Sequence, residues 1–372
     1  MCGIVGSFGF SNEKIIRRML EVTKHRGPDD TDYLLEKNCM LGINRLSILD
    51  IKLGKQPMSL DDQNIHIVFN GEIFNYLELN IDLKKKGCSF KTSNSDTETI
   101  LNGYKIYGST FFEKLNGMFA IAIYDKKKNK LILCRDRAGI KPLFYSEIAK
   151  KFFFASEIKA LLSIPFFKKD PNEQAIYNYF GLKNIPNPLT AFKNIYQVRP
   201  GEIITLSENN IKKYFFWDLS QKKIFYRKNV SENKILKTLD EAVKRQMRSD
   251  VEVGCFLSGG LDSSAVAKIA CKYTEKKLKT FSIVYENKIK SKSLDNVLSK
   301  KMSKLINSEH HELNINYESL KKELDNSINC FDQPFAGTTS SYFLSKFTSK
   351  YVKVALSGDG ADELFGSYIF PR

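Results

Sequence analysis

The stretch from Val251 to Tyr273 constrains the fold most, because it joins an apolar segment to a glycine turn and then to a helical pattern. Residues Val251–Leu257 predict a short strand that ends at the turn residues Ser258-Gly259-Gly260. Ser263–Tyr273 has small and apolar residues at helical spacing. Two glycines let the backbone approach a ligand closely, and a helix N-terminus presents free N–H groups to an anion. The stretch therefore predicts an α/β sheet with an anion site at the end of one strand.

The full turn sequence SGGLDSS is more specific than a glycine turn alone, which is common between strands and helices. No lysine follows the glycines, so this is not the GxxxxGK[ST] loop of P-loop enzymes. Serine hydroxyls can add hydrogen-bond donors, and the carboxylate of Asp262 can hold a divalent cation. Directly after an apolar strand, SGGLDSS resembles the pyrophosphate-binding loop of ATP pyrophosphatases, which activate substrates as adenylates.

The second half of the chain alternates between helical and strand patterns, which predicts a mostly parallel sheet covered by helices. Ligands of such sheets bind beyond the carboxyl ends of the strands. The acidic turn Ser357–Gly366, read as SGDGADELFG, also follows a strand, so it should face the same cleft as SGGLDSS. We predict helices at 235–248, 263–273, 294–306 and 320–330 and strands at 251–257, 280–284, 309–315 and 352–356.

The N-terminus, Met1-Cys2-Gly3, is the second informative feature. If Met1 is removed, Cys2 carries both a thiol and the α-amine of the chain. An α-amine has an ordinary pKa of about 7.7–8.0 and can take the proton of a thiol near neutral pH. One residue would then supply nucleophile and base, so none of the four histidines would be required. A cysteine at position 2 alone would more often have no catalytic meaning.

Several turns in the first half combine arginine, asparagine, glycine and carboxylates. An arginine such as Arg45 suits an α-carboxylate, and the Asn70-Gly71 pair can aim an amide and a backbone N–H at an oxyanion. Taken singly, each has an ordinary reading, since Asn-Gly is a hairpin turn and Asp96 can cap a helix. The whole ordered set favours recognition of an amino acid.

On these motifs, residues 1 to about 190 resemble a class II, N-terminal-nucleophile glutamine amidotransferase domain. With SGGLDSS and SGDGADELFG, the whole chain resembles the glutamine-dependent asparagine synthetases. The resemblance implies a four-layer αββα glutaminase sandwich followed by a parallel-sheet ATP-pyrophosphatase domain. Strands are expected in the first half at 65–69, 118–124, 130–134 and 152–155. We expect the glutaminase domain at 1–190, a connector at 191–234 and the synthetase domain at 235–372.

The resemblance assigns roles in the first half to matching positions. Cys2 is the nucleophile that forms a glutamyl thioester, and Asn70 with Gly71 forms the oxyanion hole. Residues implied to bind glutamine are Arg45, Leu46, Ser47, Ile48, Leu49, Asn70, Gly71, Glu72 and Asp96.

In the second half the resemblance implies that ATP is the co-substrate. It implies that Asp262 and Asp362 bind Mg²⁺. It also implies that Asp359 has a catalytic role in forming β-aspartyl-AMP. The implied reaction amidates aspartate to asparagine with ammonia from glutamine and releases AMP, pyrophosphate and glutamate. Residues implied to contact ATP are Leu257, Ser258, Gly259, Gly260, Asp262, Ser263, Ser264, Ile283, Ser357 and Gly358.

The chain departs from the family pattern at several places. Ile43-Asn44 stands where the family often has His-Arg, and Asp332-Gln333-Pro334 and Gly366-Ser367-Tyr368 replace its usual Asp-Glu-Pro and Gly-Gly-Tyr. The chain ends at Arg372, where family members continue, so we expect a truncated or split polypeptide.

These departures leave four alternatives open. The enzyme could amidate another carboxylate, such as a sugar acid of surface polysaccharides, or the chain could be a glutaminase-only fragment. It could also be a tRNA-modifying ATP pyrophosphatase or a non-catalytic partner subunit.

Composition narrows the class of protein further. The formal net charge of +16 favours a nucleic-acid partner, but the lysines are scattered and no nucleic-acid motif is present, so none is predicted. No apolar run of eighteen residues occurs, and no membrane segment or basic leader is predicted. Seven cysteines without CxxC spacing favour a reducing cytoplasm over a disulfide framework. The oligomeric state is left open, with a homodimer considered.

Overall fold

The computed structural model describes residues 1–372 except 61–62, 209, 222–230, 286–289, 337–338 and 367–372. The chain divides into two compact units. The first comprises Met1–Ile224 with Asp332–Ala336, and the second comprises Phe225–Phe331 with Gly337–Arg372. Of the residues that depart from the family pattern, Ser367 and Tyr368 lie outside the described residues.

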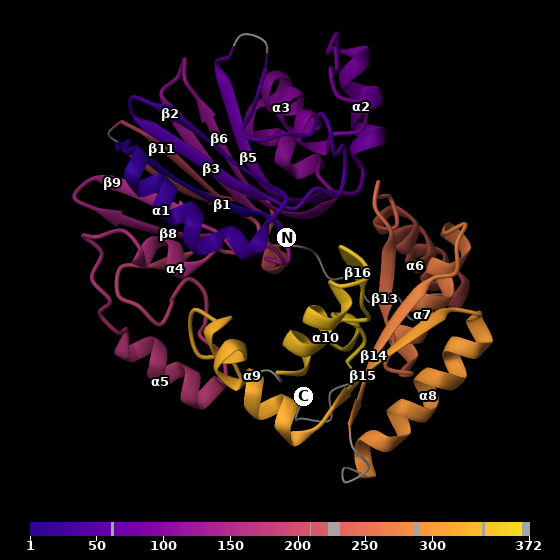
Figure 1. Cartoon of the computed structure of the whole chain (residues 1–372). Helices are drawn as coiled ribbons and strands as arrows, with labels where there is room; N and C mark the ends of the chain where they lie inside the picture. The colour runs from indigo at the N-terminus through magenta and orange to yellow at the C-terminus, as the bar shows by residue number, and fades with distance from the viewer. Residues whose placement is uncertain (61–62, 209, 222–230, 286–289, 337–338, 367–372) are drawn as a thin grey trace. The chain divides into compact units, whose positions relative to one another are not determined.

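Two six-stranded antiparallel sheets form the first unit (Figure 1). The first sheet has the order β10 (Tyr196–Gln197), β8 (Phe144–Ile148), β9 (Lys151–Ala155), β1 (Gly3–Phe8), β3 (Cys39–Arg45) and β2 (Asp30–Glu36). The second has the order β12 (Asn210–Phe215), β11 (Glu202–Ser207), β7 (Lys130–Arg135), β6 (Gly117–Asp125), β5 (Ile65–Ile73) and β4 (Met58–Ser59).

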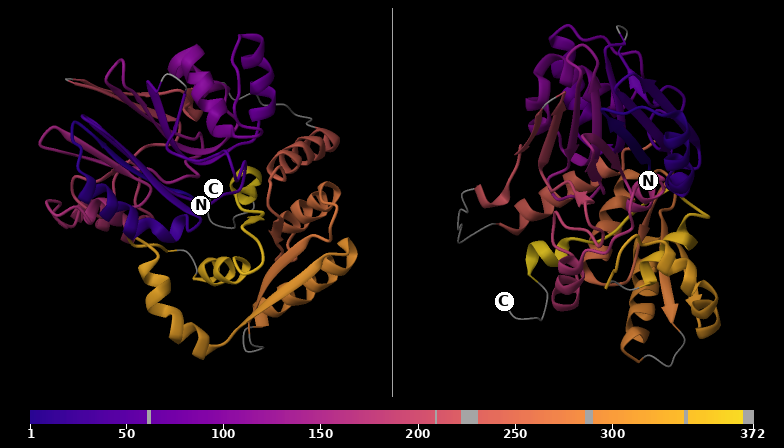
Figure 2. Two further views of the ribbon diagram at one scale, coloured as in Figure 1. Left: turned by 45° about the horizontal axis from the view of Figure 1, so that its top comes forward. Right: turned by 90° about the vertical axis from the view of Figure 1, so that its left-hand side faces the viewer.

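Helices cover the outer face of each sheet, and the central strands are therefore buried on both faces. Helices α1 (Glu13–Thr23) and α4 (Ile158–Leu162) pack on the first sheet. On the second sheet lie α2 (Tyr76–Lys85) and α3 (Asp96–Tyr107), whose Tyr76, Leu79 and Ile100 join its outer core. Figure 2 shows the two sheets as separate layers with helices outside them. This is the predicted four-layer αββα sandwich.

Strand β6 illustrates why the sequence builds these layers. Phe119, Ile121 and Ile123 enter the core shared with α2 and α3. The alternate residues Ala120 and Ala122 enter the core between the two sheets. Successive strand side chains point to opposite faces, so a strand with helices on one side and a sheet on the other must be apolar throughout. Each predicted strand of the first half has an observed counterpart, namely β5, β6, β7 and β9.

The predicted connector contributes strands to both sheets. Strand β11 pairs with β7 through Ile203↔Cys134 to Leu206↔Leu131, and β10 pairs with β8. Within β11, Ile203 faces the outer core whereas Ile204 and Leu206 face the core between the sheets. Strands β10, β11 and β12 are therefore integral to the sandwich. Helix α5 (Glu173–Leu182) and the 3-10 turns η1 (Lys24–Arg26), η2 (Gly108–Lys114) and η3 (Leu219–Gln221) complete the regular elements of this unit.

The second unit has a four-stranded parallel sheet, as predicted. Its order is β15 (Glu309–Ile315), β14 (Lys279–Tyr285), β13 (Val253–Phe256) and β16 (Val354–Leu356), and every described pairing in it is parallel. Its helices are α6 (Glu232–Gln246), α7 (Leu261–Ala270), α8 (Lys290–Ile306), α9 (Tyr317–Asn329), α10 (Ser340–Thr348) and α11 (Ala361–Phe365), with the 3-10 turn η4 (Cys271–Tyr273).

Helix boundaries differ from the predictions by a few residues. Helix α7 begins at Leu261 rather than Ser263, because Gly260 occupies its extended N-cap position. Helix α9 begins at Tyr317 rather than Leu320, after a capping box between Asn316 and Ser319. In the described part of the chain, no helix combines the length and apolarity needed to cross a bilayer.

The core between the sheets should carry much of the stability of the first unit. We expect Phe154→Ala to lower the free energy of unfolding by about 3–5 kcal/mol, because Phe154 is fully buried there and its loss leaves a cavity. The matched control Phe180→Ala, on an 80% exposed ring of α5, should change it by less than about 0.5 kcal/mol. Urea unfolding followed by fluorescence of Trp217, the single tryptophan, reports on this unit. Equal effects of the two substitutions would contradict this assignment of the core.

Candidate functional site

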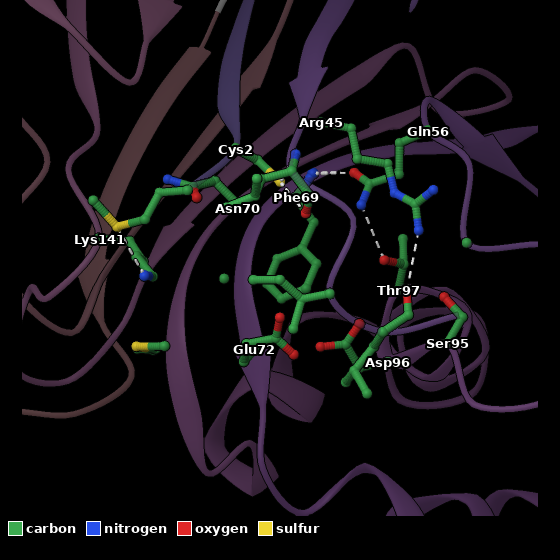
Figure 3. A pocket seen from close by; sticks show the side chains of 17 residues that line it. Cys2, Arg45, Gln56, Phe69, Asn70, Glu72, Ser95, Asp96, Thr97 and Lys141 are labelled. Atoms are coloured by element: carbon green, nitrogen blue, oxygen red, sulfur yellow. Dashed lines mark hydrogen bonds between the residues drawn. The ribbon is translucent and has the colours of Figure 1, made fainter. Parts of the chain in front are cut away.

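A pocket of the first unit lies at the start of β1 and gathers most of the predicted glutamine-binding residues (Figure 3). All of them line it except Ser47, whose backbone N–H donates to Asp29 Oδ2 at 2.8 Å instead. The lining residues are Met1, Cys2, Arg45, Leu46, Ile48, Leu49, Gly54, Gln56, Phe69, Asn70, Gly71, Glu72, Ser95, Asp96, Thr97, Met118 and Lys141.

The thiol of Cys2 lies against the backbone that follows β3. Its Sγ accepts from Leu46 N at 3.4 Å and donates to Leu46 O at 3.7 Å. This placement follows from strand pairing, because Gly3 of β1 lies opposite Asn44 of β3. Burial raises the pKa of the Cys2 thiol. Burial also lowers the pKa of the neighbouring α-amine of Met1 to about 6, so this amine is largely neutral near pH 7.

Asn70 presents a buried carboxamide without a protein partner. Only 1% of the residue is exposed, and neither Nδ2 nor Oδ1 has a hydrogen-bond partner among the described residues. A buried unpaired polar group costs about 1–3 kcal/mol, so such a group in a pocket indicates a place for a ligand. The next residue, Gly71, admits no side chain, because a Cβ would lie 2.1 Å from Met118 O. Asn70 thus presents an unpaired side-chain amide in the pocket of Cys2, and Gly71 presents backbone without a side chain.

Arg45 is buried and organises the loop that follows it. Its Nη1 donates to Ile51 O at 3.0 Å, and its Nη2 donates to Leu49 O at 3.1 Å and Asp50 O at 2.9 Å. A guanidinium has five N–H donors, so Arg45 can hold the loop and still donate into the pocket. Asn44, which stands where the family often has arginine, points to the opposite face of β3 from Arg45. It donates to Leu20 O at 2.7 Å, near the end of α1.

Carboxylates and an amide form the far wall of the pocket. Asp96, at the start of α3, accepts from Ile73 N at 2.9 Å. Burial raises the pKa of the Asp96 carboxyl to about 7, while the charge of Arg45 acts in the opposite direction. Gln56 accepts from Phe69 N at 2.7 Å and donates to Thr97 Oγ1 at 3.1 Å, which ties the wall to β5 and α3.

Gln56, Thr97, Met118 and Lys141 line the pocket but were not predicted. Gln56 and Lys141 belong to no motif, whereas Thr97 directly follows the predicted Asp96 and Met118 begins the predicted strand 118–124. Lys141 is buried, which lowers the pKa of its ammonium, and its Nζ lies 3.0 Å from the sulfur of Met1. Met1 therefore occupies space beside Cys2 that its removal would open.

The second unit has its own pocket of about 490 Å³ at the carboxyl ends of β13 and β16. Because these strands are neighbours, the turns after them meet at one edge of the sheet. Predicted residues that line the pocket are Leu257, Ser258, Gly260, Asp262, Ser263, Ile283, Ser357, Gly358, Asp359 and Asp362. Gly259 and Ser264, also predicted to contact ATP, do not line it. Sequence reasoning missed the lining residues Asp295, Asn296 and Ser299 of α8 and Ser340, Ser341 and Ser345 of α10.

The glycine turn has little room for side chains. Gly259 has φ +85°, and a Cβ there would lie 2.5 Å from Ser299 N. A Cβ on Gly358 would lie 2.8 Å from Ser263 N. The Oγ atoms of Ser258 and Ser263 lie 2.9 Å apart. Gly259 therefore packs against the backbone of α8, and Gly358 packs against the backbone of the 258–264 turn. The serine hydroxyls remain as polar lining of the pocket.

The acidic residues of this pocket fit a magnesium ion whose coordination is completed by a bound nucleotide and water. Asp262 and Asp362 line one pocket with several hydroxyl groups. Among the described residues, no group of three or more His, Cys, Asp or Glu side chains could hold a metal by itself. Mg²⁺ is commonly held by one or two carboxylates with phosphate oxygens and water, so this donor set suits it together with a nucleotide.

The raised pKa of Asp96 predicts a pH-dependent stability. Between its ordinary value of 3.8 and about 7, folded Asp96 keeps a proton that the unfolded chain releases. Its contribution to stability must therefore fall as pH rises through this range. We expect the unfolding free energy of the wild type minus that of Asp96→Asn to fall by about 1 kcal/mol or more from pH 5 to pH 8. Urea titrations with Trp217 fluorescence measure it, and a constant or rising difference would contradict the burial argument.

Comparison with known proteins gives the same two-part division. Residues 1–217 match the family described as glutamine amidotransferase domain, and residues 234–372 match the family described as asparagine synthase. Among solved structures, the glutamine phosphoribosylpyrophosphate amidotransferase of Bacillus subtilis aligns with 73% of this chain and 64% of that chain, at 18% identity and a TM-score of 0.44.

Curated relatives match almost the whole chain. It is 38% identical to a Methanocaldococcus jannaschii relative that carries the provisional name glutamine-hydrolyzing asparagine synthetase 2, over 99% of this chain and 76% of the relative. It is 37% identical to the Bacillus subtilis glutamine-hydrolyzing asparagine synthetase 1 and 34% identical to asparagine synthetase 3, in each case over 99% of this chain. The chain spans 59% and 63% of the length of these two Bacillus relatives. With both domain families matched in this order, the chain belongs to the family of glutamine-hydrolysing asparagine synthetases.

Proposed function

We propose that this chain hydrolyses glutamine at Cys2 and uses the ammonia to convert aspartate to asparagine, through an adenylate made in the second unit. The observation that carries the glutaminase step is the buried, unpaired carboxamide of Asn70 in the pocket of Cys2. The choice of aspartate as acceptor is supported by the names of the relatives. Glutamine, aspartate and ATP are the proposed substrates, and cytoplasmic location and a homodimer stay predictions.

The first step uses the residues of the Cys2 pocket. After loss of Met1, the α-amine of Cys2 takes the thiol proton, and the thiolate attacks the side-chain amide carbon of glutamine. Asn70 Nδ2 and the backbone N–H of Gly71 stabilise the negative oxygen that develops. The α-ammonium of Cys2 returns its proton to the amide nitrogen, the carbon–nitrogen bond breaks and neutral ammonia leaves. Water then hydrolyses the thioester to glutamate. Arg45 holds the α-carboxylate, and Glu72 with Asp96 holds the α-ammonium, which favours the ionised form of Asp96.

The second step uses the two turns of the second unit. A carboxylate oxygen of aspartate attacks the α-phosphorus of ATP, and the bond to the pyrophosphate oxygen breaks. Backbone and hydroxyl groups of the 258–264 turn hold the pyrophosphate, and Asp262 and Asp362 would hold Mg²⁺, which offsets phosphate charge. Ammonia attacks the acyl carbon of the adenylate, and AMP leaves. Asp359, fixed by a hydrogen bond of 2.9 Å from Ser357 Oγ, lies at the pocket where the adenylate forms.

Removing the Asn70 carboxamide should impair hydrolysis of glutamine while leaving the fold intact. We expect Asn70→Ala to lower kcat for glutamate release by about 10²–10³-fold, the usual cost of one oxyanion donor. Asn178→Ala on α5 is the matched control and should leave kcat unchanged. The assay uses protein whose loss of Met1 has been verified by mass spectrometry. Wild-type rates in Asn70→Ala, or full activity in Cys2→Ala, would refute the assignment of this site.

Synthetase chemistry should depend on the second pocket alone. We expect Asp359→Asn to lower aspartate-dependent exchange between ATP and pyrophosphate by at least about tenfold, because the carboxylate lies where charge rearranges. Glutamate release should stay unchanged, since the glutaminase pocket lies in the other unit. Asp325→Asn, an exposed change on α9, is the control. Exchange that is absent from the wild-type chain, or unaffected by Asp359→Asn, would count against the adenylation step.

A further inference from the structure

A buried ion pair lies behind the nucleophile, outside the pocket lining. Arg26 Nε donates to the backbone carbonyl of Cys2 at 2.9 Å, and its Nη1 donates to Glu157 Oε1 at 2.8 Å. The Arg26 and Glu157 side chains are 9% and 12% exposed. Burial alone would raise the pKa of the Glu157 carboxyl, but contacts from His25 and Arg26 outweigh it and hold the pKa at about 2. Glu157 is therefore charged at neutral pH.

Strand pairing explains why this pair sits at the start of the chain. Strand β9 ends at Ala155, and the next residue, Ser156, donates its N–H to Ile4 O at 2.8 Å. Ser156 Oγ also accepts from Ile4 N at 3.0 Å, so Glu157 follows directly beside the first residues of β1. Gly3 lets Arg26 cross this segment, since a Cβ there would lie 3.2 Å from Arg26 Cδ.

A second set of contacts fixes the far side of Glu157. Lys159 Nζ lies 3.5 Å from Glu157 Oε2 and 3.3 Å from Asp332 Oδ1. Asp332 Oδ2 accepts from Ile158 N at 2.6 Å, at the first turn of α4. This short helix has no cap from the side chain of its own N-cap residue, so Asp332 supplies the acceptor. Asp332 belongs to the segment Asp332–Ala336 of the first unit, far away in sequence.

We propose that Glu157 is a positioning residue for the nucleophile: it fixes Arg26, which holds the carbonyl of Cys2, while Lys159, itself paired with Asp332, holds Glu157. The proposal rests on the proposed glutaminase function. Buried ion pairs contribute little to stability on average, because desolvation offsets their attraction. The effect of the Arg26–Glu157 pair on the position of Cys2 matters more than its effect on stability, since a displacement of about 1 Å at a reacting group can lower the rate by about 10²-fold. Because no member of this cluster lines the pocket, substrate binding should be spared.

Glutaminase kinetics of Glu157 variants test the proposal. We expect Glu157→Gln to lower kcat for glutamate release by about 10–100-fold, with KM for glutamine within about twofold of wild type. Glu157→Asp should recover part of kcat, because it restores the charge, and Asp332→Asn should lower kcat less than Glu157→Gln. The control Glu173→Gln removes an exposed pair with Lys193 and should change neither constant. An unchanged kcat, or a KM that rises in proportion as kcat falls, would overturn the proposal.

A measurement that needs no catalysis separates failure of this proposal from failure of the proposed function. Iodoacetamide alkylation is followed by mass spectrometry at Cys2, with the exposed Cys330 as internal reference. We expect Glu157→Gln to speed alkylation of Cys2 by at least about threefold, because release of its carbonyl lets the thiol reach solvent, with Cys330 unchanged. A wild-type chain that releases no glutamate refutes the proposed function, but alkylation still decides the positioning role. Equal Cys2 rates in wild type and Glu157→Gln overturn it.

Discussion

The pairing of β1 with β3 on one side and β9 on the other is the constraint on which the glutaminase site depends. It places the first residues of the chain in the middle of a buried sheet, so that Cys2 emerges at a fixed point beside Leu46. A chain terminus is ordinarily mobile, and a terminal nucleophile needs such an anchor. The same pairing brings Ser156 and Glu157 next to Ile4, which sets the charged contacts behind the nucleophile.

The pocket concentrates groups that are unfavourable for folding. The Asn70 carboxamide is buried without a partner, the Asp96 carboxyl has a raised pKa, and Lys141 is buried with a lowered one. Each departs from the rule that buried polar groups are satisfied and buried charges paired. Apolar layers on both sides of the strands stabilise the sandwich enough to tolerate them. Such departures gathered in one pocket indicate preorganisation for a ligand rather than a defect in packing.

The second unit builds its pocket at one edge of a parallel sheet. Parallel strands place all their carboxyl ends at one edge, so turns that are about 100 residues apart in sequence meet there. Gly259 lets the first turn approach the backbone of α8, and Gly358 lets the second turn approach the backbone of Asp262 and Ser263. Serine hydroxyls and the carboxylates of Asp262 and Asp362 remain around the pocket. Helices α8 and α10 supply the remaining walls, with residues that carry no motif of their own.

Local patterns in the sequence indicated the parallel sheet and the glycine turn, and the resemblance to a known family implied the sandwich and about half of the lining residues of each pocket. Periodicity and glycine turns are read over a few neighbouring residues, and Cys2, Asn70 and the SGGLDSS turn lie within such patterns. Only the tertiary structure decided that Gln56 and Lys141 line the first pocket, that Asn44 supports α1, and that β10, β11 and β12 complete the sheets. It also decided that Asp332 caps α4. These contacts join residues far apart in the chain, and a local sequence pattern does not identify the distant residue that makes each contact.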